Sequence, residues 1–164
     1  NTIQHAGLVI GIGGSLRGIG ANLYQGMRRE RSGYLHRAAF QMNYSAVTAA
    51  LMMVKKEVYE KAGGFEEELS VAFNDVDFCL RVKEMGYLIV YDPLVEAYHY
   101  ESKSRGAEDS PEKVARFQSE IEFMRNRWEN LLKKGDPNYN IHFSRVRADY
   151  SLGDPEVILR QNRK

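Results

Sequence analysis

Cysteine and long apolar runs are what this chain lacks. Cys79 is the only cysteine among 164 residues, so no intrachain disulfide can form and a reducing compartment is expected. No apolar run reaches the ~18 residues that a membrane-spanning helix needs, and the polar residues 1–6 do not resemble a signal peptide. The formal net charge of +1 points to neither nucleic acid nor an acidic partner. These absences predict a cytoplasmic globular protein.

The length fits one domain that can bury a hydrophobic core. The first residue, Asn1, is not methionine, and we expect the chain to begin inside a longer gene. The apolar run 6–12, bounded by glycines, predicts a buried strand, and the glycine-rich segment 13–33 predicts a loop. From residue 136 onward the chain is polar and weakly patterned, and 151–164 is interpreted as a polar tail.

Apolar runs and glycine stops predict alternating helices and strands between residues 34 and 134. Helices are predicted at 34–42, 55–62, 73–85 and 111–134, with Asn74 and Ser110 as N-caps of the last two. Further strands are predicted at 46–54, 87–91 and 95–101, with a turn at Asp92-Pro93. This alternation favours an α/β fold. The strands are few, so we expect a partial mixed sheet flanked by helices, with a long C-terminal helix.

Three features that suggest chemistry have plainer explanations. The segment GIGGSLRGIG lacks the glycine spacing and the following helix pattern of a dinucleotide-binding turn. Cys79 lies among the apolar residues of a predicted helix, which favours a buried, inert thiol over a nucleophile. The arginines at 28, 29, 31 and 37 either contact phosphates or belong to a solvated loop, and the loop is favoured.

Two carboxylates stand at the start of the helix predicted at 73–85. Asp75 and Asp77 are about 200° apart around a helix, so they cannot face the same cleft. Asp77 precedes Arg81 by one helical turn, which predicts a structural ion pair. Asp75 is then left in the first turn, where the helix dipole stabilises an ionised carboxylate. On spacing alone, a role in starting the helix and a role as a proton acceptor both remain open for Asp75.

The run GGFEEELSVAFNDVDFCLRVKEMGY (63–87) resembles the acceptor-site segment of the family-2 glycosyltransferases. The preceding NYSAVTAALMMVKKEVYEKAGGF (43–65) resembles the strand-then-helix unit of that family, and YHYESKSRG (98–106) resembles the strand and loop that close its active site. The resemblance covers roughly residues 2–150. It is strongest to members that build bacterial polysaccharides, and the rhamnose-transferring branch is the preferred guess. It implies that 1–150 is the C-terminal, acceptor-side part of an inverting enzyme with a GT-A-type fold.

The resemblance implies a mechanism and its residues. An acceptor hydroxyl attacks the anomeric carbon of a nucleotide-sugar, and the carboxylate at the second position of the acidic pair, here Asp75, removes the hydroxyl proton. The first position is Asn74 in place of the family's glutamate. Thr48 matches the family's T-G-A, with Ala49 replacing the glycine. The family's nucleotide-binding half, with its D-x-D-like motif, is not present in this sequence. We therefore expect the chain alone to be inactive.

The segment after the predicted strand 95–101 carries further candidates. In similar enzymes a histidine at the position of His99 helps to hold a divalent cation, Mg²⁺ or Mn²⁺, that neutralises the leaving diphosphate. We expect the intact enzyme to use this cation and the chain alone to bind none. Glu101 shares the strand face of His99, and Lys103 and Arg105 follow in a polar loop and could clamp the diphosphate. A hydrogen-bonded histidine and a solvated loop are the plainer alternatives.

The predicted helix 111–134 carries an apolar stripe of Val114, Phe117, Ile121, Met124, Trp128 and Leu131. Packing within the domain is favoured for this stripe over pairing in a homodimer or peripheral contact with the inner membrane. The expected partners are a nucleotide-sugar donor and a saccharide acceptor, with no nucleic acid. The alternative to an enzyme is a non-catalytic module that binds glycan or completes the sheet of another subunit.

Overall fold

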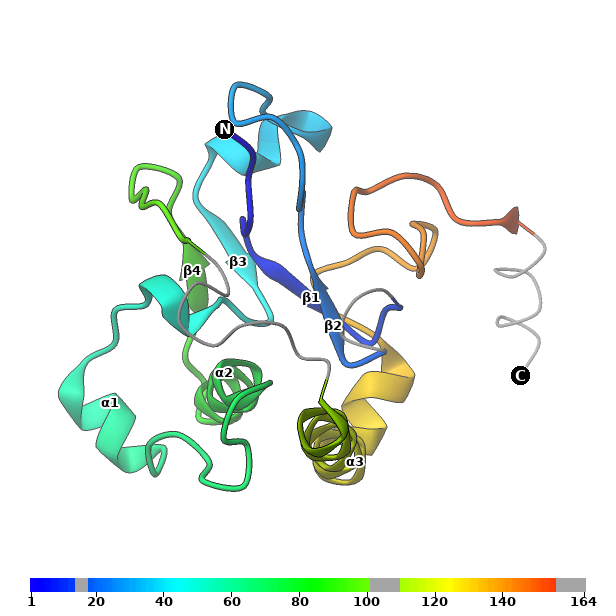
Figure 1. Cartoon of the computed structure of the whole chain (residues 1–164). Helices are drawn as coiled ribbons and strands as arrows, with labels where there is room; N and C mark the ends of the chain where they lie inside the picture. Colours follow the sequence, from blue (N-terminus) through cyan, green and yellow to red (C-terminus); the bar gives the residue numbers. More distant parts are fainter. Residues whose placement is uncertain (14–17, 101–109, 156–164) are drawn as a thin grey trace.

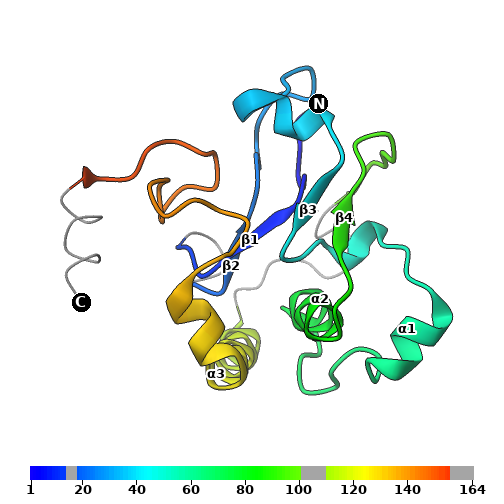
Figure 2. The same ribbon diagram turned by 180° about the vertical axis from the view of Figure 1, so that it is seen from behind.

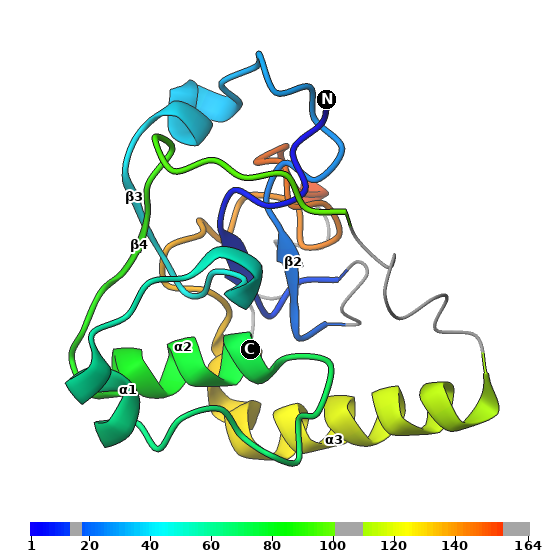
Figure 3. The ribbon, with the colours of Figure 1, turned by 60° about the vertical axis from the view of Figure 1, so that its left-hand side comes forward.

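The computed structural model describes residues 1–13, 18–100 and 110–155. Its helices and strands follow the order β1 (Leu8–Ile10), β2 (Gly20–Asn22), η1 (Tyr34–Ala39), β3 (Met42–Tyr44), η2 (Ala49–Leu51), α1 (Lys56–Lys61), α2 (Asn74–Glu84), β4 (Ile89–Tyr91) and α3 (Pro111–Lys134). The helices α2 and α3 lie side by side on one side of the strands (Figure 1, Figure 3). No helix in the described ranges has the length and apolar character to cross a membrane.

The strands form two small antiparallel pairs. β1 pairs with β2 in a register that sets Val9 opposite Ala21, and β3 pairs with β4. The Leu8 amide donates to the Ala46 carbonyl at 3.0 Å, which links the first pair to the segment after β3. The α/β class and the long helix are therefore confirmed. The expected mixed sheet is, in the described residues, two antiparallel pairs of three-residue strands.

The three predicted α-helices are confirmed. α1 and α2 lie within the predicted 55–62 and 73–85, and α3 spans the predicted 111–134 with the Ser110 hydroxyl accepting the Lys113 amide. The short helix predicted at 34–42 is the 3₁₀ segment η1. Asn74 is not the N-cap of α2. That place belongs to Phe73, whose φ of 65° is left-handed, and Asn74 is the first helical residue.

Two strand predictions and one loop prediction were wrong. Segment 46–54 is no strand, because the Thr48 hydroxyl accepts the Ala50 amide and starts the turn η2. The loop predicted at 13–33 contains β2, where Gly20 permits a close approach: a Cβ there would meet the Val9 carbonyl oxygen at 2.7 Å. Residues 95–100 pair with no strand in the part of the chain that the structure describes, because the chain turns away at the confirmed Asp92 turn.

The stripe of α3 packs inside the domain, as predicted. Ile121, Met124 and Trp128 are buried in one core with residues of α2, β1 and the segment before α2, and Phe117 and Leu131 pack against it. A second core contains Val9, Ala21 and Tyr44, together with Tyr139 and Tyr150 from the segment after α3. This segment, which looked weakly patterned, folds back over β1 and β2 (Figure 2).

Asp77 joins α2 to its neighbours. Its side chain is fully buried and accepts hydrogen bonds from Arg81 Nε at 2.8 Å and from Trp128 Nε1 of α3 at 2.9 Å. Arg81 in turn donates to the carbonyl oxygens of Ala62 and Gly64, at the turn after α1. The predicted Asp77–Arg81 ion pair is therefore confirmed, and it connects α1, α2 and α3.

Replacing Asp77 with alanine should destabilise the fold by about 3–5 kcal/mol, because it leaves the buried guanidinium of Arg81 without its charge partner. Urea unfolding at neutral pH measures this loss. The matched control is Glu129→Ala, because Glu129 forms an ion pair of the same i,i+4 spacing with Lys133 on the surface. That variant should lose no more than about 1 kcal/mol. Equal losses in the two variants would contradict the structural role of Asp77.

Candidate functional site

Asp75 lies in the first turn of α2, half-buried at the molecular surface. Its Oδ2 accepts a hydrogen bond from the Ala49 amide at 3.0 Å, and its Oδ1 accepts one from the Val76 amide at 2.8 Å. Asp77 faces the other side of the helix, toward α3, as the spacing predicted. Within the described ranges Asp75 forms no ion pair. Asp75 is therefore an anchored carboxylate whose charge no basic side chain of the described residues neutralises.

The turn that faces Asp75 is held from three sides. Thr48 donates its amide to His5 Nε2 at 3.2 Å, and the Val47 carbonyl accepts a long 3.7 Å hydrogen bond from Cys79 Sγ. Asp75 itself holds Ala49. Thr48 was expected on a central strand, but its hydroxyl caps η2 instead, so its candidate substrate contact would come from a turn. Burial raises the pKa of Cys79 to about 12, in keeping with the predicted inert thiol.

Sequence reasoning missed His5. Its Nδ1 lies 2.8 Å from Asn22 Oδ1, and its Nε2 accepts the Thr48 amide, which together require a neutral ring with the proton on Nδ1. Burial lowers the pKa of His5, although the hydrogen bond to Asn22 and the charge of Asp75 oppose this shift. No pattern in the sequence marks His5, because all its partners lie far along the chain.

Glu120 was also missed. This carboxylate of α3 is 1% exposed. It accepts hydrogen bonds from the amides of Val71 and Ala72, at 2.9 and 3.1 Å, and from the Ser70 hydroxyl. These bonds fix the segment that leads into α2, and so they set where Asp75 stands. Glu120 follows Phe117 by three residues on the apolar face of α3, and an acidic residue within such a stripe is the signal that could have revealed it.

The other predicted site residues are not brought to Asp75 by any contact in the described residues. Asn74 is half-buried beside Asp75 at the start of α2. His99 is exposed, with its Nδ1 3.1 Å from Gln4 Oε1. In the part of the chain that the structure describes, no three acidic, histidine or cysteine side chains gather into a metal site. The remaining predicted residues, Glu101, Lys103 and Arg105, lie outside the described residues, and their roles stay predictions.

Comparison with known proteins relates most of this chain to part of longer ones. It is 48% identical over 154 residues to an uncharacterized protein, y4gI, of Sinorhizobium fredii, covering 93% of this chain and 16% of that protein. It is 33% identical over 151 residues to the O-antigen biosynthesis protein RfbC of Myxococcus xanthus, covering 92% of this chain and 11% of that protein. No protein-family model and no solved structure matches.

A third relative is named for sugar transfer. The chain is 27% identical over 81 residues to the N-acetylglucosaminyl-diphospho-decaprenol L-rhamnosyltransferase of Mycobacterium tuberculosis, covering 49% of this chain and 26% of that protein. The chain thus spans about a quarter or less of each of these relatives. The names of the second and third relatives indicate a glycosyltransferase-like family.

Stability should fall as the pH drops below 6.5, in part through His5. Because burial lowers its folded-state pKa, the unfolded chain binds the His5 proton first, near the ordinary value of 6.5. The stabilisation is therefore complete above pH 6.5 and is lost as the pH falls toward the lowered value. Urea unfolding of the wild type and of His5→Gln at pH 7.5 and 5.5 measures this.

In His5→Gln, which does not titrate, the pH-dependent loss should be smaller. His142→Gln is the control, because His142 is exposed and should leave the wild-type pH dependence unchanged. An equal slope in wild type and His5→Gln would show that His5 is not buried as a neutral ring.

Proposed function

We propose that this chain is the acceptor-side part of a family-2 glycosyltransferase that transfers a sugar, with inversion, from a nucleotide-sugar to a saccharide acceptor in bacterial polysaccharide assembly. Two observations support the proposal. The chain is similar over 92% of its length to a protein named for O-antigen biosynthesis, and over 49% to a rhamnosyltransferase. Asn74 and Asp75, which match the two positions of the family's acidic pair, also lie at the start of α2. Rhamnose is the donor sugar that we favour.

The state of Asp75 is the observation that carries this proposal. Of the two acidic residues in the first turn of α2, Asp77 is buried and fully engaged with Arg81 and Trp128. Asp75 is half-buried at the surface and has no ion-pair partner in the described residues. A carboxylate in this state can accept a proton from a ligand, whereas Asp77 cannot do so without breaking the contact between α2 and α3.

The proposed reaction uses Asp75 as the general base. Its carboxylate takes the proton of the acceptor hydroxyl as the hydroxyl oxygen attacks the anomeric carbon from the side opposite the diphosphate. The new carbon–oxygen bond forms as the bond to the diphosphate breaks, and the configuration is inverted. The Ala49 and Val76 amides fix the orientation of the carboxylate.

Other residues have supporting roles in this proposal. Thr48 and Asn74 flank Asp75, in the facing turn and in the chain respectively, and are proposed to hold acceptor hydroxyl groups by hydrogen bonds. Glu101, Lys103 and Arg105 keep their proposed contacts to the donor. A divalent cation remains part of the proposal for the complete enzyme. Among the described residues only His99 is a candidate ligand, which is too few to build a site, so no step is assigned to the cation.

Replacing Asp75 with asparagine should lower kcat of the complete protein that contains this chain by about 10²–10⁴-fold, because general-base catalysis is lost. The KM for the nucleotide-sugar should change little, since Asp75 faces the acceptor. The amide is isosteric and still offers an oxygen to the Ala49 amide, so the fold should persist. Release of nucleoside diphosphate measures the rate.

The matched control is Glu67→Gln, which neutralises an exposed carboxylate in the segment before α2. It should turn over like the wild type. Near-wild-type turnover by Asp75→Asn would rule out Asp75 as the base. If the complete protein transfers no sugar yet binds saccharide, the glycan-binding alternative takes the place of the enzyme.

A further inference from the structure

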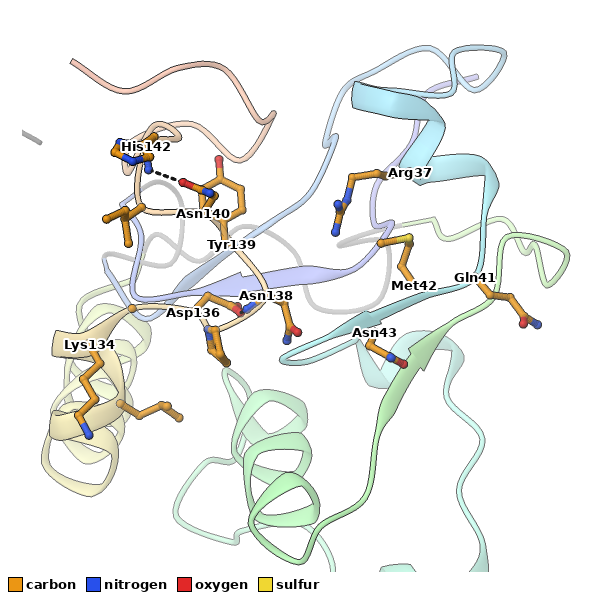
Figure 4. A pocket seen from close by; sticks show the side chains of 14 residues that line it. Arg37, Gln41, Met42, Asn43, Lys134, Asp136, Asn138, Tyr139, Asn140 and His142 are labelled. Atoms are coloured by element: carbon orange, nitrogen blue, oxygen red, sulfur yellow. Dashed lines mark hydrogen bonds between the residues drawn. The ribbon is translucent and has the colours of Figure 1, made fainter. Parts of the chain in front are cut away.

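A broad pocket opens on a part of the molecule that the proposed reaction does not use. It has a volume of about 1020 Å³ and lies between the segment from η1 to β3, residues 37–43, and the end of α3 with the turn that follows it, residues 131–142 (Figure 4). None of its lining residues belongs to the surroundings of Asp75. Its volume would hold a small organic ligand or a sugar or two.

Arg37 projects into this pocket (Figure 4). Its guanidinium lies 5.0 Å from the centre of the Tyr150 ring, and its Nε is buried without a hydrogen bond. No carboxylate in the described ranges forms an ion pair with it. Burial disfavours this charge, but the neighbouring hydroxyl groups of Tyr150 and Tyr44 offset that effect and raise the pKa of Arg37. Arg37 therefore stays a cation that faces the pocket, and this arrangement favours the binding of an anion.

The groups around Arg37 do not neutralise it. The hydroxyl groups of Tyr44 and Tyr150 are buried without a hydrogen bond of normal geometry, and burial raises the pKa of both, so they stay protonated at neutral pH. Asp136 also lines the pocket, but its carboxylate is already occupied. It accepts the Ile10 amide at 2.9 Å, the Ser45 hydroxyl at 2.8 Å and the Asn138 amide at 2.8 Å.

Lys134 is a second basic side chain of the lining, and it stands at the end of α3 and forms no ion pair in the described residues (Figure 4). Arg37 is therefore the cation that an anion in this pocket would pair with, and the one carboxylate of the lining, Asp136, is already held by the Ile10 and Asn138 amides and the Ser45 hydroxyl.

Carboxamides supply hydrogen-bonding groups beside Arg37. Asn43 is exposed on β3, and its side chain forms no hydrogen bond in the described part of the chain. Asn138 donates its Nδ2 to the Ser45 hydroxyl at 3.3 Å, which leaves its carbonyl oxygen available. Figure 4 shows Asn43, Asn138 and Met42 around the space below the guanidinium. A fork of guanidinium donors with nearby amides suits a ligand that carries both an anionic group and hydroxyl groups.

We propose that this pocket binds an anionic saccharide, a sugar that carries a carboxylate or a phosphate. The anionic group pairs with Arg37, and the sugar hydroxyls bond to Asn43 and Asn138. The negative charge of the ligand is inferred from Arg37 alone, whereas the choice of a sugar over another organic anion rests on the proposed function.

Titration calorimetry and saturation-transfer NMR on the protein with glucuronate, glucose 1-phosphate, inorganic phosphate and glucose test this inference. At least one of the two anionic sugars should bind at millimolar concentration or below, at least about tenfold more tightly than glucose, and more weakly as salt is added. The better of the two identifies the group that Arg37 recognises. Inorganic phosphate binding as tightly as either anionic sugar would refute the saccharide, and no binding by any anion would refute the site.

Arg37→Gln should weaken binding of the anionic sugar by about tenfold or more, because the charged fork is lost. Arg28→Gln is the matched control, since Arg28 is an exposed arginine paired with Glu30, and it should bind like the wild type. Near-UV circular dichroism checks that Arg37→Gln keeps its tyrosine packing. If it does not, Asn43→Ala removes a contact from an exposed strand position and should itself weaken binding.

Wild-type affinity in folded Arg37→Gln, or in Asn43→Ala when Arg37→Gln is misfolded, would overturn the proposal. Asp75→Asn should leave this binding unchanged. If Asp75→Asn loses turnover and no anion binds to the protein, the pocket proposal is refuted and the proposed enzyme function stands. If Asp75→Asn keeps its turnover and anions bind beneath Arg37, the anion site stands and the proposed catalytic role is refuted.

Discussion

The buried carboxylate of Asp77 is the constraint on which the rest of the structure depends. Through Arg81 and Trp128 it fixes α2 against α3 and against the turn after α1. Glu120 of α3 completes this constraint by binding the backbone just before α2. The start of α2 is therefore set by two buried carboxylates, each with several donors. A buried charge is tolerated only when hydrogen bonds or an opposite charge compensate it. The hydrogen bonds that Asp77 and Glu120 need therefore fix the geometry of the surface beside Asp75.

Asp75 and Asp77, two positions apart in α2, thus lie in different environments because of helical geometry. The turn of about 200° between them sends Asp77 into the core and leaves Asp75 at the surface. On the surface side, the turn 47–49 is held by His5, Cys79 and Asp75 itself. Asp75, the candidate proton acceptor, is therefore held in place by these neighbours, and none of them neutralises its charge. Such positioning by surrounding contacts is what precise proton transfer requires.

The sequence predicted what depends on neighbours along the chain. The three α-helices, the Ser110 cap, the Asp77–Arg81 pair and the separation of Asp75 from Asp77 all follow from spacings of a few residues. The predictions from sequence were wrong or missing where contacts between distant segments determine the structure. β2 lies in a glycine-rich stretch whose Gly20 matters only because β1 passes close by. His5 and Glu120 contact backbone that is 43 and 49 residues away, so their partners cannot be read from a local pattern, although the apolar stripe around Glu120 could have marked it as buried.

One segment connects the Asp75 site with the pocket beneath Arg37. Asn43 lines the pocket, Ser45 is held by Asp136 of the pocket wall, Thr48 is held by His5, and Ala49 by Asp75. From Asn43 to Ala49 the chain can span at most about 22 Å, which is the length of a few sugar units. A saccharide that pairs with Arg37 would therefore lie near one end of this segment, while Asp75 holds its other end. The hydrogen bonds of Asp136 and His5 are the physical link between the two proposed sites, because each holds one end of this segment to the strands around β1.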